Sequence, residues 1–563
     1  MKRFTCIIVL GFVSSCLFSQ TSLPTFFGDH MVLQQKSKVA IWGKDTPDQN
    51  IEIRGSWGEK ASVKTDKEGN WKVFLKTIAA GGPYALTVNG SEEIVFKNLL
   101  LGEVWLCLGQ SNMGWALRNT FEGEATMAKA KNSNLRIYKS DRQNWHEPKT
   151  DCPSGKWSIS GPQSAGNTSA VSYYFAERLQ KELGVPVGII VQAYAGTPIE
   201  GWMPWDVQSG SNRSISLKSE LDETSKRQEE KLGFTEEKAF KTYQKQLDLY
   251  QKQMAANDTM KNKVKKRMLP VITKPARLGN QYPSNIYNAM VHPLLGYGIK
   301  GIIWYQGERN SKTVQQARDF KEQLQLLIGF YRKKWHEMSN GNVNKDFYFS
   351  MTQLPSWNPV QTQPVEGLEA PWAVSRHAML EIISETPNTG LAVSIDTGDA
   401  FQLHPKNKKP IGYRHAFNVL HDVYKKPIVA HGPYFDSQNI EGNKIILTFN
   451  SVGSGLITGK KGKLNTFAIA GEDKKWHWAD VEIIHGKVVV YSDKVTDPKA
   501  VRYAWAMNPS ERNLLYNKEG LPASPFRTDT WKLFEKGSDE VTVFKPKKPK
   551  GYKAKDWDRP KMQ

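Results

Sequence analysis

The chain has 563 residues, of which 39% are apolar and 24% charged. At roughly 100–200 residues per domain, this length predicts two to four domains. The apolar content excludes a wholly disordered chain, and four cysteines in so long a chain exclude a disulfide scaffold. The formal net charge is +21, but the Lys and Arg are dispersed outside a middle segment and the tail. Because no nucleic-acid-binding motif accompanies them, we expect no nucleic-acid partner.

The first 20 residues are typical of a secretory signal peptide. Lys2 and Arg3 precede a short apolar run at residues 6–13, and small residues follow. We therefore expect a secreted or periplasmic protein. The alternative is a lipid anchor at Cys16, because residues 13–16 resemble a lipobox. Beyond this segment no apolar run reaches about 18 residues, so we expect no transmembrane helix.

Residues 21–102 are predicted to form an N-terminal β domain. Residues 39–42, 51–54 and 71–75 have short alternating apolar patterns, and Gly, Asp and Asn turns separate them. This spacing favours a small β-sandwich. Residues 431–530 show the same texture at 444–449, 487–491 and 500–505, which predicts a second sandwich-like β region. We expect the basic tail at 531–563 to be solvated.

Residues 103–430 are predicted to form an α/β domain with a doubly wound parallel sheet. Residues 104–108 are almost wholly apolar, as in a strand buried on both faces. Further strands are expected at 185–191, 299–304, 347–351 and 391–395, and they alternate with helical stretches such as 169–183 and 314–335. A Lys-, Glu- and Gln-rich stretch at 214–266 predicts a helical insertion. Cys107 and Cys152 are either one disulfide or two buried thiols.

The first candidate for chemistry is Ser111, in GQSNM at residues 109–113. It follows the strand at 104–108, and ligands bind at the carboxyl ends of strands in open α/β sheets. Met113 stands where a nucleophile elbow, G-x-S-x-G, would have its second glycine. The alternative is a plain turn or helix cap without chemistry.

A serine nucleophile needs a base, and His404 lies in a loop that also holds Asp396 and Asp399. No second His or Cys near it has ligand spacing, so we expect no catalytic metal. WYQGERN at 304–310 follows another strand. There Gln306 and Asn310 can donate hydrogen bonds to an oxyanion, and Glu308 can orient a histidine.

Gly196 follows the strand at 185–191 and can supply a backbone N–H. Four strand ends of one sheet thus present a serine, an N–H group, amides and an Asp/His pair. Together they are the parts that acyl transfer requires.

The chain resembles the sialate O-acetylesterase family of the SGNH (GDSL-like) hydrolase superfamily. The resemblance extends over nearly the whole chain after the signal segment. It is carried by MVLQQ at 31–35, GGPY at 81–84, GQSNM at 109–113, GTPIEGW at 196–202, YNAM at 287–290, WYQGERN at 304–310, HPKNK at 404–408, AGED at 470–473, VRY at 501–503 and GLPASPFRTD at 520–529.

The resemblance implies that Ser111 is the nucleophile, His404 the base, and the N–H groups of Ser111 and Gly196 oxyanion donors. Gln306 stands where the superfamily places an Asn donor. The acid is open, because Phe401 and Gln402 stand where relatives carry Asp. The QGE motif suggests Glu308, and Asp399 and Asp396 remain alternatives. Further departures, at Leu108, Gly114 and Ala195, could reshape the pocket.

The implied function is removal of O-acetyl groups from sugars, most of all sialic acid, without a cofactor. An acetylxylan or other polysaccharide esterase is the alternative. A carbohydrate-binding protein and a protease or lipase are the competing classes. Asn310 and Arg414 are predicted to bind substrate, with Arg309 and Arg376 as further residues that could pair with a carboxylate. The alternative for each of the three arginines is a structural or surface role.

Overall fold

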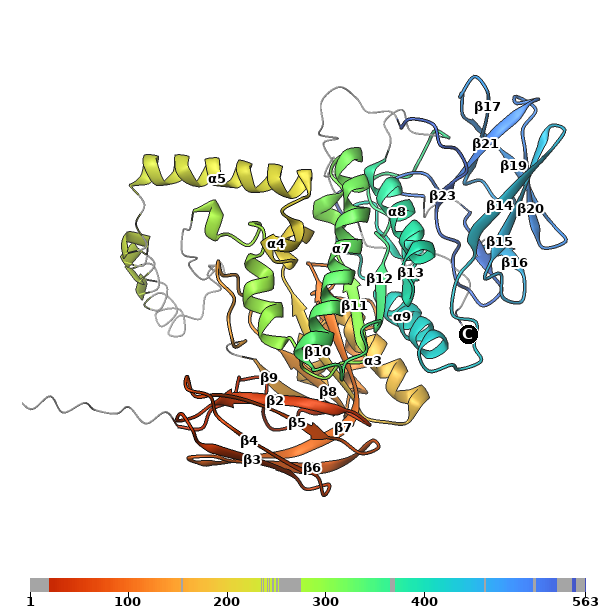
Figure 1. Ribbon diagram of the computed structural model, residues 1–563. Helices are drawn as coiled ribbons and strands as arrows, with labels where there is room; N and C mark the ends of the chain where they lie inside the picture. The colour runs from red at the N-terminus through yellow and green to blue at the C-terminus, as the bar shows by residue number, and fades with distance from the viewer. Residues whose placement is uncertain are drawn as a thin grey trace, which may run out of the picture.

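The computed structural model describes residues 20–563 apart from 153–154, 234, 236, 240, 243, 246–247, 250–251, 253–274, 365–369, 460–461, 510–512, 534–548, 553–561 and 563. The predicted signal peptide and Cys16 therefore lie outside the described residues, as does most of the second half of the predicted insertion. In the described part, an α/β region lies between two regions of antiparallel strands (Figure 1).

Apart from β1, which pairs in parallel with residues 100–102, the N-terminal strands form two small antiparallel groups around apolar side chains. One group pairs β2 with β5, and the other joins β3 to β4 and β6. Alternating residues such as Ile51, Ile53 and Leu75 are fully buried between them. The strands are β1 (Val32–Gln34), β2 (Lys38–Lys44), β3 (Asn50–Gly55), β4 (Lys60–Lys64), β5 (Asn70–Lys76) and β6 (Gly81–Asn89).

A single strand, β7 (Glu93–Gly109), runs from this region into the central sheet. Its first half pairs with β6 and its second half with β10 and β11. The strand crosses residue 102, where we predict the first domain boundary, so that division of the chain stays a prediction.

The central sheet has the strand order β13-β12-β11-β7-β10-β8-β9. The first six strands are parallel, and β9 runs antiparallel to β8. This confirms the predicted strands around residues 104–108, 185–191, 299–304 and 347–351. The bounds are β8 (Asn132–Lys139), β9 (Lys156–Ser160), β10 (Val187–Ala193), β11 (Gly301–Tyr305), β12 (Tyr348–Thr352) and β13 (Thr389–Ala392).

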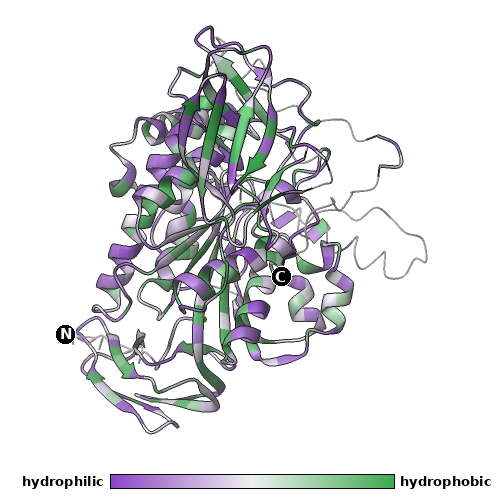
Figure 2. Cartoon of the chain, turned by 90° about the vertical axis from the view of Figure 1, so that its right-hand side faces the viewer, coloured by the Kyte–Doolittle hydropathy of each residue, from purple (hydrophilic) through white to green (hydrophobic). Residues whose placement is uncertain are grey.

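Both faces of the sheet are covered by helices, which explains why its strands are apolar throughout. On β7, Trp105 and Cys107 belong to a core shared with α3 and α9, whereas Leu106 and Leu108 face the core that holds α7. Figure 2 shows apolar colour gathered in these inner strands. The helices are α1 (Gly123–Ala128), α2 (Pro162–Asn167), α3 (Ala170–Leu183), α4 (Trp205–Gln208), α5 (Asn212–Leu232), α7 (Val314–Met338), α8 (Pro371–Glu385) and α9 (Lys409–Asp422).

The predicted helices at 169–183 and 314–335 are confirmed, and α5 forms the first part of the predicted insertion. Ser169 caps α3 by accepting a hydrogen bond from the Ser172 N–H. Short turns of 3-10 or π-helix lie in the connections: η1 (Leu117–Asn119), η2 (Ile199–Trp202), η3 (Ala276–Leu278), η4 (Tyr287–Val291), η5 (His292–Leu294), η6 (Glu308–Asn310) and η7 (Ile395–Thr397). None of the helices in the described residues has the length and apolar content needed to cross a membrane.

The C-terminal strands form antiparallel sheets, as the sequence predicts. Two of these sheets have the orders β14-β15-β20-β19 and β18-β17-β21-β23, and β16 pairs with β22. The bounds are β14 (Tyr434–Glu441), β15 (Lys444–Asn450), β16 (Leu456–Thr458), β17 (Phe467–Gly471), β18 (His477–Trp478), β19 (Asp480–Ile484), β20 (Lys487–Tyr491), β21 (Pro498–Tyr503), β22 (Leu515–Asn517) and β23 (Phe526–Arg527).

The structure decides the state of the two cysteines and corrects the expectation for the basic tail. Cys107 and Cys152 are both buried free thiols, so the disulfide alternative is wrong. The basic tail is not solvated at Tyr552, whose ring packs on Phe401 at 4.7 Å between centroids and whose hydroxyl donates to Asp399 at 3.1 Å.

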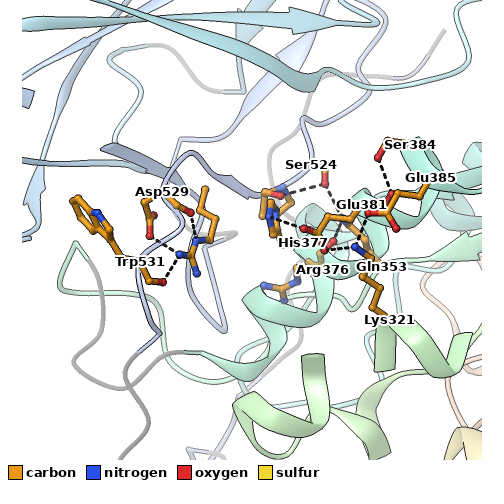
Figure 3. Close-up of polar contacts among 12 residues, drawn as sticks. Lys321, Gln353, Arg376, His377, Glu381, Ser384, Glu385, Ser524, Asp529 and Trp531 are labelled. Carbon is orange, nitrogen blue, oxygen red and sulfur yellow. Dashed lines mark hydrogen bonds and ion pairs between the residues drawn. The ribbon is translucent and has the colours of Figure 1, made fainter. Parts of the chain in front are cut away.

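The C-terminal region is fastened to α8 by polar contacts (Figure 3). Gln353 Nε2 donates to Ser524 Oγ at 2.7 Å and to the Arg376 carbonyl at 2.9 Å. Within the C-terminal region itself, Arg527 donates to Asp529 and to the Trp531 carbonyl, both at 2.6 Å.

Candidate active site

Three strand ends meet at Gly109, which places Ser111 at the carboxyl edge of the sheet. Gly109 is in register with Ala193 of β10 and Tyr305 of β11, and its carbonyl accepts a hydrogen bond from the Tyr194 N–H at 3.0 Å. Its φ is +150°, and a Cβ there would lie 2.1 Å from the Tyr305 carbonyl oxygen. The chain therefore needs a glycine at the turn that presents Ser111.

The structure brings Ser111 and His404 together. The Ser111 Oγ and the His404 Nε2 lie 2.8 Å apart, within hydrogen-bonding distance. Trp115 stacks on the imidazole, with centroids 5.0 Å apart and planes inclined by 16°. The indole thus restrains the ring that faces the serine. A hydroxyl and an imidazole in this relation can act as a nucleophile and its general base.

The backbone around Ser111 provides donors for an oxyanion. In the described part of the chain, neither the Ser111 N–H nor the Gly196 N–H donates a hydrogen bond to another group of the protein. Gly196 is exposed and has a φ of +73°, a conformation that suits glycine. Both N–H groups can therefore bind a developing negative charge.

The structure does not support Gln306 as an oxyanion donor. Its side-chain NH₂ donates to the Asn310 Oδ1 at 2.8 Å and to the Thr197 carbonyl at 3.3 Å, so both hydrogens are used. The residue is fully buried. The expectation is wrong in this arrangement because the amide joins the loops after β10 and β11 to each other.

Asn310 belongs to the same buried network. Its Oδ1 also accepts from the Ile199 N–H at 2.8 Å, and its Nδ2 donates to Glu200 at 2.9 Å. Both the oxygen and the nitrogen of the Asn310 amide are thus hydrogen-bonded to buried groups of the protein. These bonds argue against the predicted contact with substrate.

The carboxylates near His404 have different partners. Glu308 is buried and accepts a hydrogen bond from the Asn112 side chain, and burial raises its pKa. Asp399 accepts from the Phe401 N–H at 2.8 Å and so shapes the loop that carries His404. Asp396 forms a two-pronged ion pair with Arg414, with N–O distances of 2.6 and 2.7 Å.

For two of the arginines the structure favours the structural role over the predicted contact with substrate. Arg414 is 2% exposed, and its charge is neutralised by Asp396. Arg376 is fully buried and donates to four backbone carbonyls. Arg309 is partly exposed, lies between Glu308 and Asn310, and donates to Gln281.

Asn112 and Lys408 join a buried polar network beside the site, and the sequence analysis did not single them out. The Lys408 ammonium, fully buried, donates to the Asn112 Oδ1. The Asn112 Nδ2 donates to Glu308 and, at 3.2 Å, to the Leu403 carbonyl. Burial lowers the pKa of Lys408 to about 7. Both residues lie in the quoted GQSNM and HPKNK motifs, but only the structure shows that their side chains meet.

Comparisons with known proteins agree with this site. Residues 101–274 match the family model "Carbohydrate esterase, sialic acid-specific acetylesterase". Two sialate O-acetylesterases, from Rattus norvegicus and Homo sapiens, are each 24% identical over 89% of this chain and over 93% and 91% of their own lengths. The crystal structure of XAC1771, a carbohydrate acetylesterase from Xanthomonas citri, is 32% identical with a TM-score of 0.73, over 91% of this chain and all of that one.

These matches and the serine–histidine pair define the class of protein as a carboxylic ester hydrolase. The chain belongs to the family of carbohydrate acetylesterases that includes the sialic acid-specific acetylesterases.

Proposed function

We propose that this protein is a serine esterase that removes O-acetyl groups from sialic acid, with Ser111 as nucleophile and His404 as base. The observation that carries the proposal is the 2.8 Å contact between Ser111 Oγ and His404 Nε2. The fold supports it, because Ser111 follows the central strand of a sheet covered on both faces, as in an SGNH hydrolase domain.

The reaction has two halves. His404 takes the Ser111 proton while Oγ attacks the acetyl carbonyl carbon, and the N–H groups of Ser111 and Gly196 bind the oxyanion. The C–O bond to the sugar then breaks, and His404 gives the proton to the leaving sugar oxygen. Water attacks the acetyl-enzyme with His404 again as base, and acetate leaves.

Glu308 and Asp399 have supporting roles in this proposal. Glu308 holds the Asn112 amide, which in turn binds the carbonyl next to His404. Asp399 fixes the loop two residues further upstream, at Phe401. Through these contacts the two carboxylates set the position of the imidazole relative to Ser111.

The substrate class rests on the names of the relatives and on one local charge. A sialic acid carries a carboxylate, and the partly exposed Arg309 on η6 is the arginine that we propose to bind it. We expect Arg309→Met to raise KM at least about 10-fold for O-acetylated sialic acid, which loses its ion pair, and to leave KM for a neutral aryl acetate unchanged. Equal changes in both values of KM would contradict this assignment.

The decisive experiment measures acetate release from an aryl acetate by wild type and Ser111→Ala. We expect a loss of at least about 10⁴-fold in kcat in a variant with unchanged circular dichroism. Ser209→Ala, at an exposed serine, is the matched control and should retain full activity. Turnover that survives in Ser111→Ala would show that the nucleophile is another residue.

Acetylated sialic acid and acetylxylan then serve as competing substrates. Faster release from acetylxylan would replace sialic acid as the substrate. No release from any ester would favour the carbohydrate-binding alternative.

We also propose export of the protein by the signal segment at residues 1–20, either in soluble form or anchored at Cys16. We further propose a division into functional parts at residues 21–102, 103–430 and 431–530.

A further inference from the structure

Two histidines and an aspartate meet at the end of α9. The Asp422 Oδ1 lies 2.7 Å from the His421 Nδ1 and 3.1 Å from the His431 Nε2. The three atoms lie within 4.8 Å of one another, and in the described part of the chain no other group of three such side chains is so close. The two histidines are ten positions apart, a spacing that does not resemble a ligand motif, so this cluster is not evident in the sequence.

The cluster lies at the edge of the sheet opposite Ser111. Tyr348, the first residue of β12, donates its hydroxyl to the Asp422 Oδ2 and so fixes the carboxylate. Asp422 and His431 also line a cavity of about 600 Å³, which Thr389 at the start of β13 and Tyr434 of β14 help to enclose. This cavity leaves room for water beside Asp422 and His431.

We propose that His421, Asp422 and His431 bind one zinc ion. Imidazole nitrogen and carboxylate oxygen are ligands that Zn²⁺ accepts, and three protein ligands with water in the fourth position form a common tetrahedral set. Ligand atoms about 2.0–2.1 Å from a tetrahedral ion lie roughly 3.3 Å apart. The two separations on Asp422, 2.7 and 3.1 Å, therefore need to widen by about 0.6 and 0.2 Å.

The charge of the cluster suits a cation. Asp422 contributes a carboxylate whose Oδ1 faces both imidazoles, while its Oδ2 accepts from the Tyr348 hydroxyl. Two other charged groups line the cavity, Glu381 and Lys425, and the Lys425 ammonium is bound to the Asp422 carbonyl at 2.7 Å.

Zinc at this point would join two parts of the molecule. His421 and Asp422 belong to α9, whereas the carbonyl of His431 accepts a hydrogen bond from Asn517 of β22 at 3.0 Å. The ion would thus tie the α/β region to the C-terminal strands. Because it lies away from Ser111, its role is structural, and the esterase reaction does not depend on it.

The test is zinc binding to the untagged full chain after removal of metals by dialysis. Calorimetric titration should give one Zn²⁺ per chain for wild type, and zinc should raise Tm because it binds only the folded state. We expect His421→Ala, at the most exposed ligand, and His431→Ala to bind at least about 100-fold more weakly, and Tyr348→Phe about 10-fold more weakly.

His485→Asn removes an exposed imidazole from a turn between β19 and β20 and should bind zinc like wild type. Circular dichroism shows whether each variant is folded, and His421→Ala keeps the test valid if His431→Ala is not. Absence of one-to-one binding by wild type, or unchanged affinity in both folded histidine variants, would overturn the proposal.

Discussion

At the scale of single residues, the position of His404 depends on an amide that has no chemistry of its own. Asn112 is adjacent to Ser111, and its side chain holds the Leu403 carbonyl next to His404. A side-chain amide can flip by rotation, which exchanges the positions of its donor Nδ2 and its acceptor Oδ1. Lys408 opposes this when it is protonated because an ammonium only donates, and Glu308 on the other side only accepts when it is ionised.

We therefore expect Lys408→Met to lower kcat about 10–100-fold and to change KM little, because the serine and histidine remain but lose their relative position. Steady-state kinetics with an aryl acetate measure both constants. Lys406→Met makes the same change at an exposed residue of the same loop and should keep wild-type kcat. A rise in KM at constant kcat would contradict a positioning role.

At the scale of elements, α9 is attached to the sheet by a buried histidine. His415 lies between the hydroxyls of Ser350 and Thr352 on β12, at 2.7 Å from each, and is fully buried. Burial lowers its pKa from 6.5 to about 3. The native state thus keeps the imidazole neutral where the unfolded chain takes up a proton.

This difference sets the direction of a pH effect. Between about pH 6.5 and pH 3 the unfolded state binds more protons, so the stability that neutral His415 contributes is complete above pH 6.5 and is lost as the pH falls. At about pH 5 the loss amounts to about 2 kcal/mol. We expect the fall in the free energy of unfolding between about pH 7.5 and pH 5 to be smaller by that amount in His415→Asn.

Urea denaturation at the two pH values measures this difference. His485→Asn, the same change at an exposed site, should keep the wild-type fall. If the free energy of unfolding fell equally in His415→Asn and in wild type, His415 would take no part in the loss of stability at low pH.

Local sequence patterns predict the helices and strands of this fold better than they predict the contacts between those elements. The strand at 104–108 was predictable because a run of apolar residues is what burial on both faces requires. The proximity of Ser111 and His404 was predictable because each lies in a short motif that follows a strand. The pairing of Lys408 with Asn112, 296 residues apart, was not, nor was the commitment of Gln306 to Asn310. Such contacts depend on how distant segments pack, which periodicity does not record.

At the scale of the whole molecule, one arginine joins the α/β region to the C-terminal strands. Arg376 of α8 donates to the carbonyls of Leu354 and Pro355, which follow β12, and to those of Ala506 and Met507, which follow β21. The distances are 2.7–3.1 Å, and Figure 3 shows Arg376 at this junction. Burial lowers its pKa to about 9, so it is still a cation at neutral pH.

We expect Arg376→Met to destabilise the protein by about 3 kcal/mol, because carbonyls of both regions lose their donor inside the molecule. The change should also uncouple the two regions, so that urea unfolding, followed by circular dichroism and tryptophan fluorescence, separates into two transitions. Arg118→Met, at an exposed arginine, is the matched control and should unfold like wild type. A single transition for Arg376→Met at the wild-type midpoint would show that apolar packing alone holds the C-terminal strands against α8.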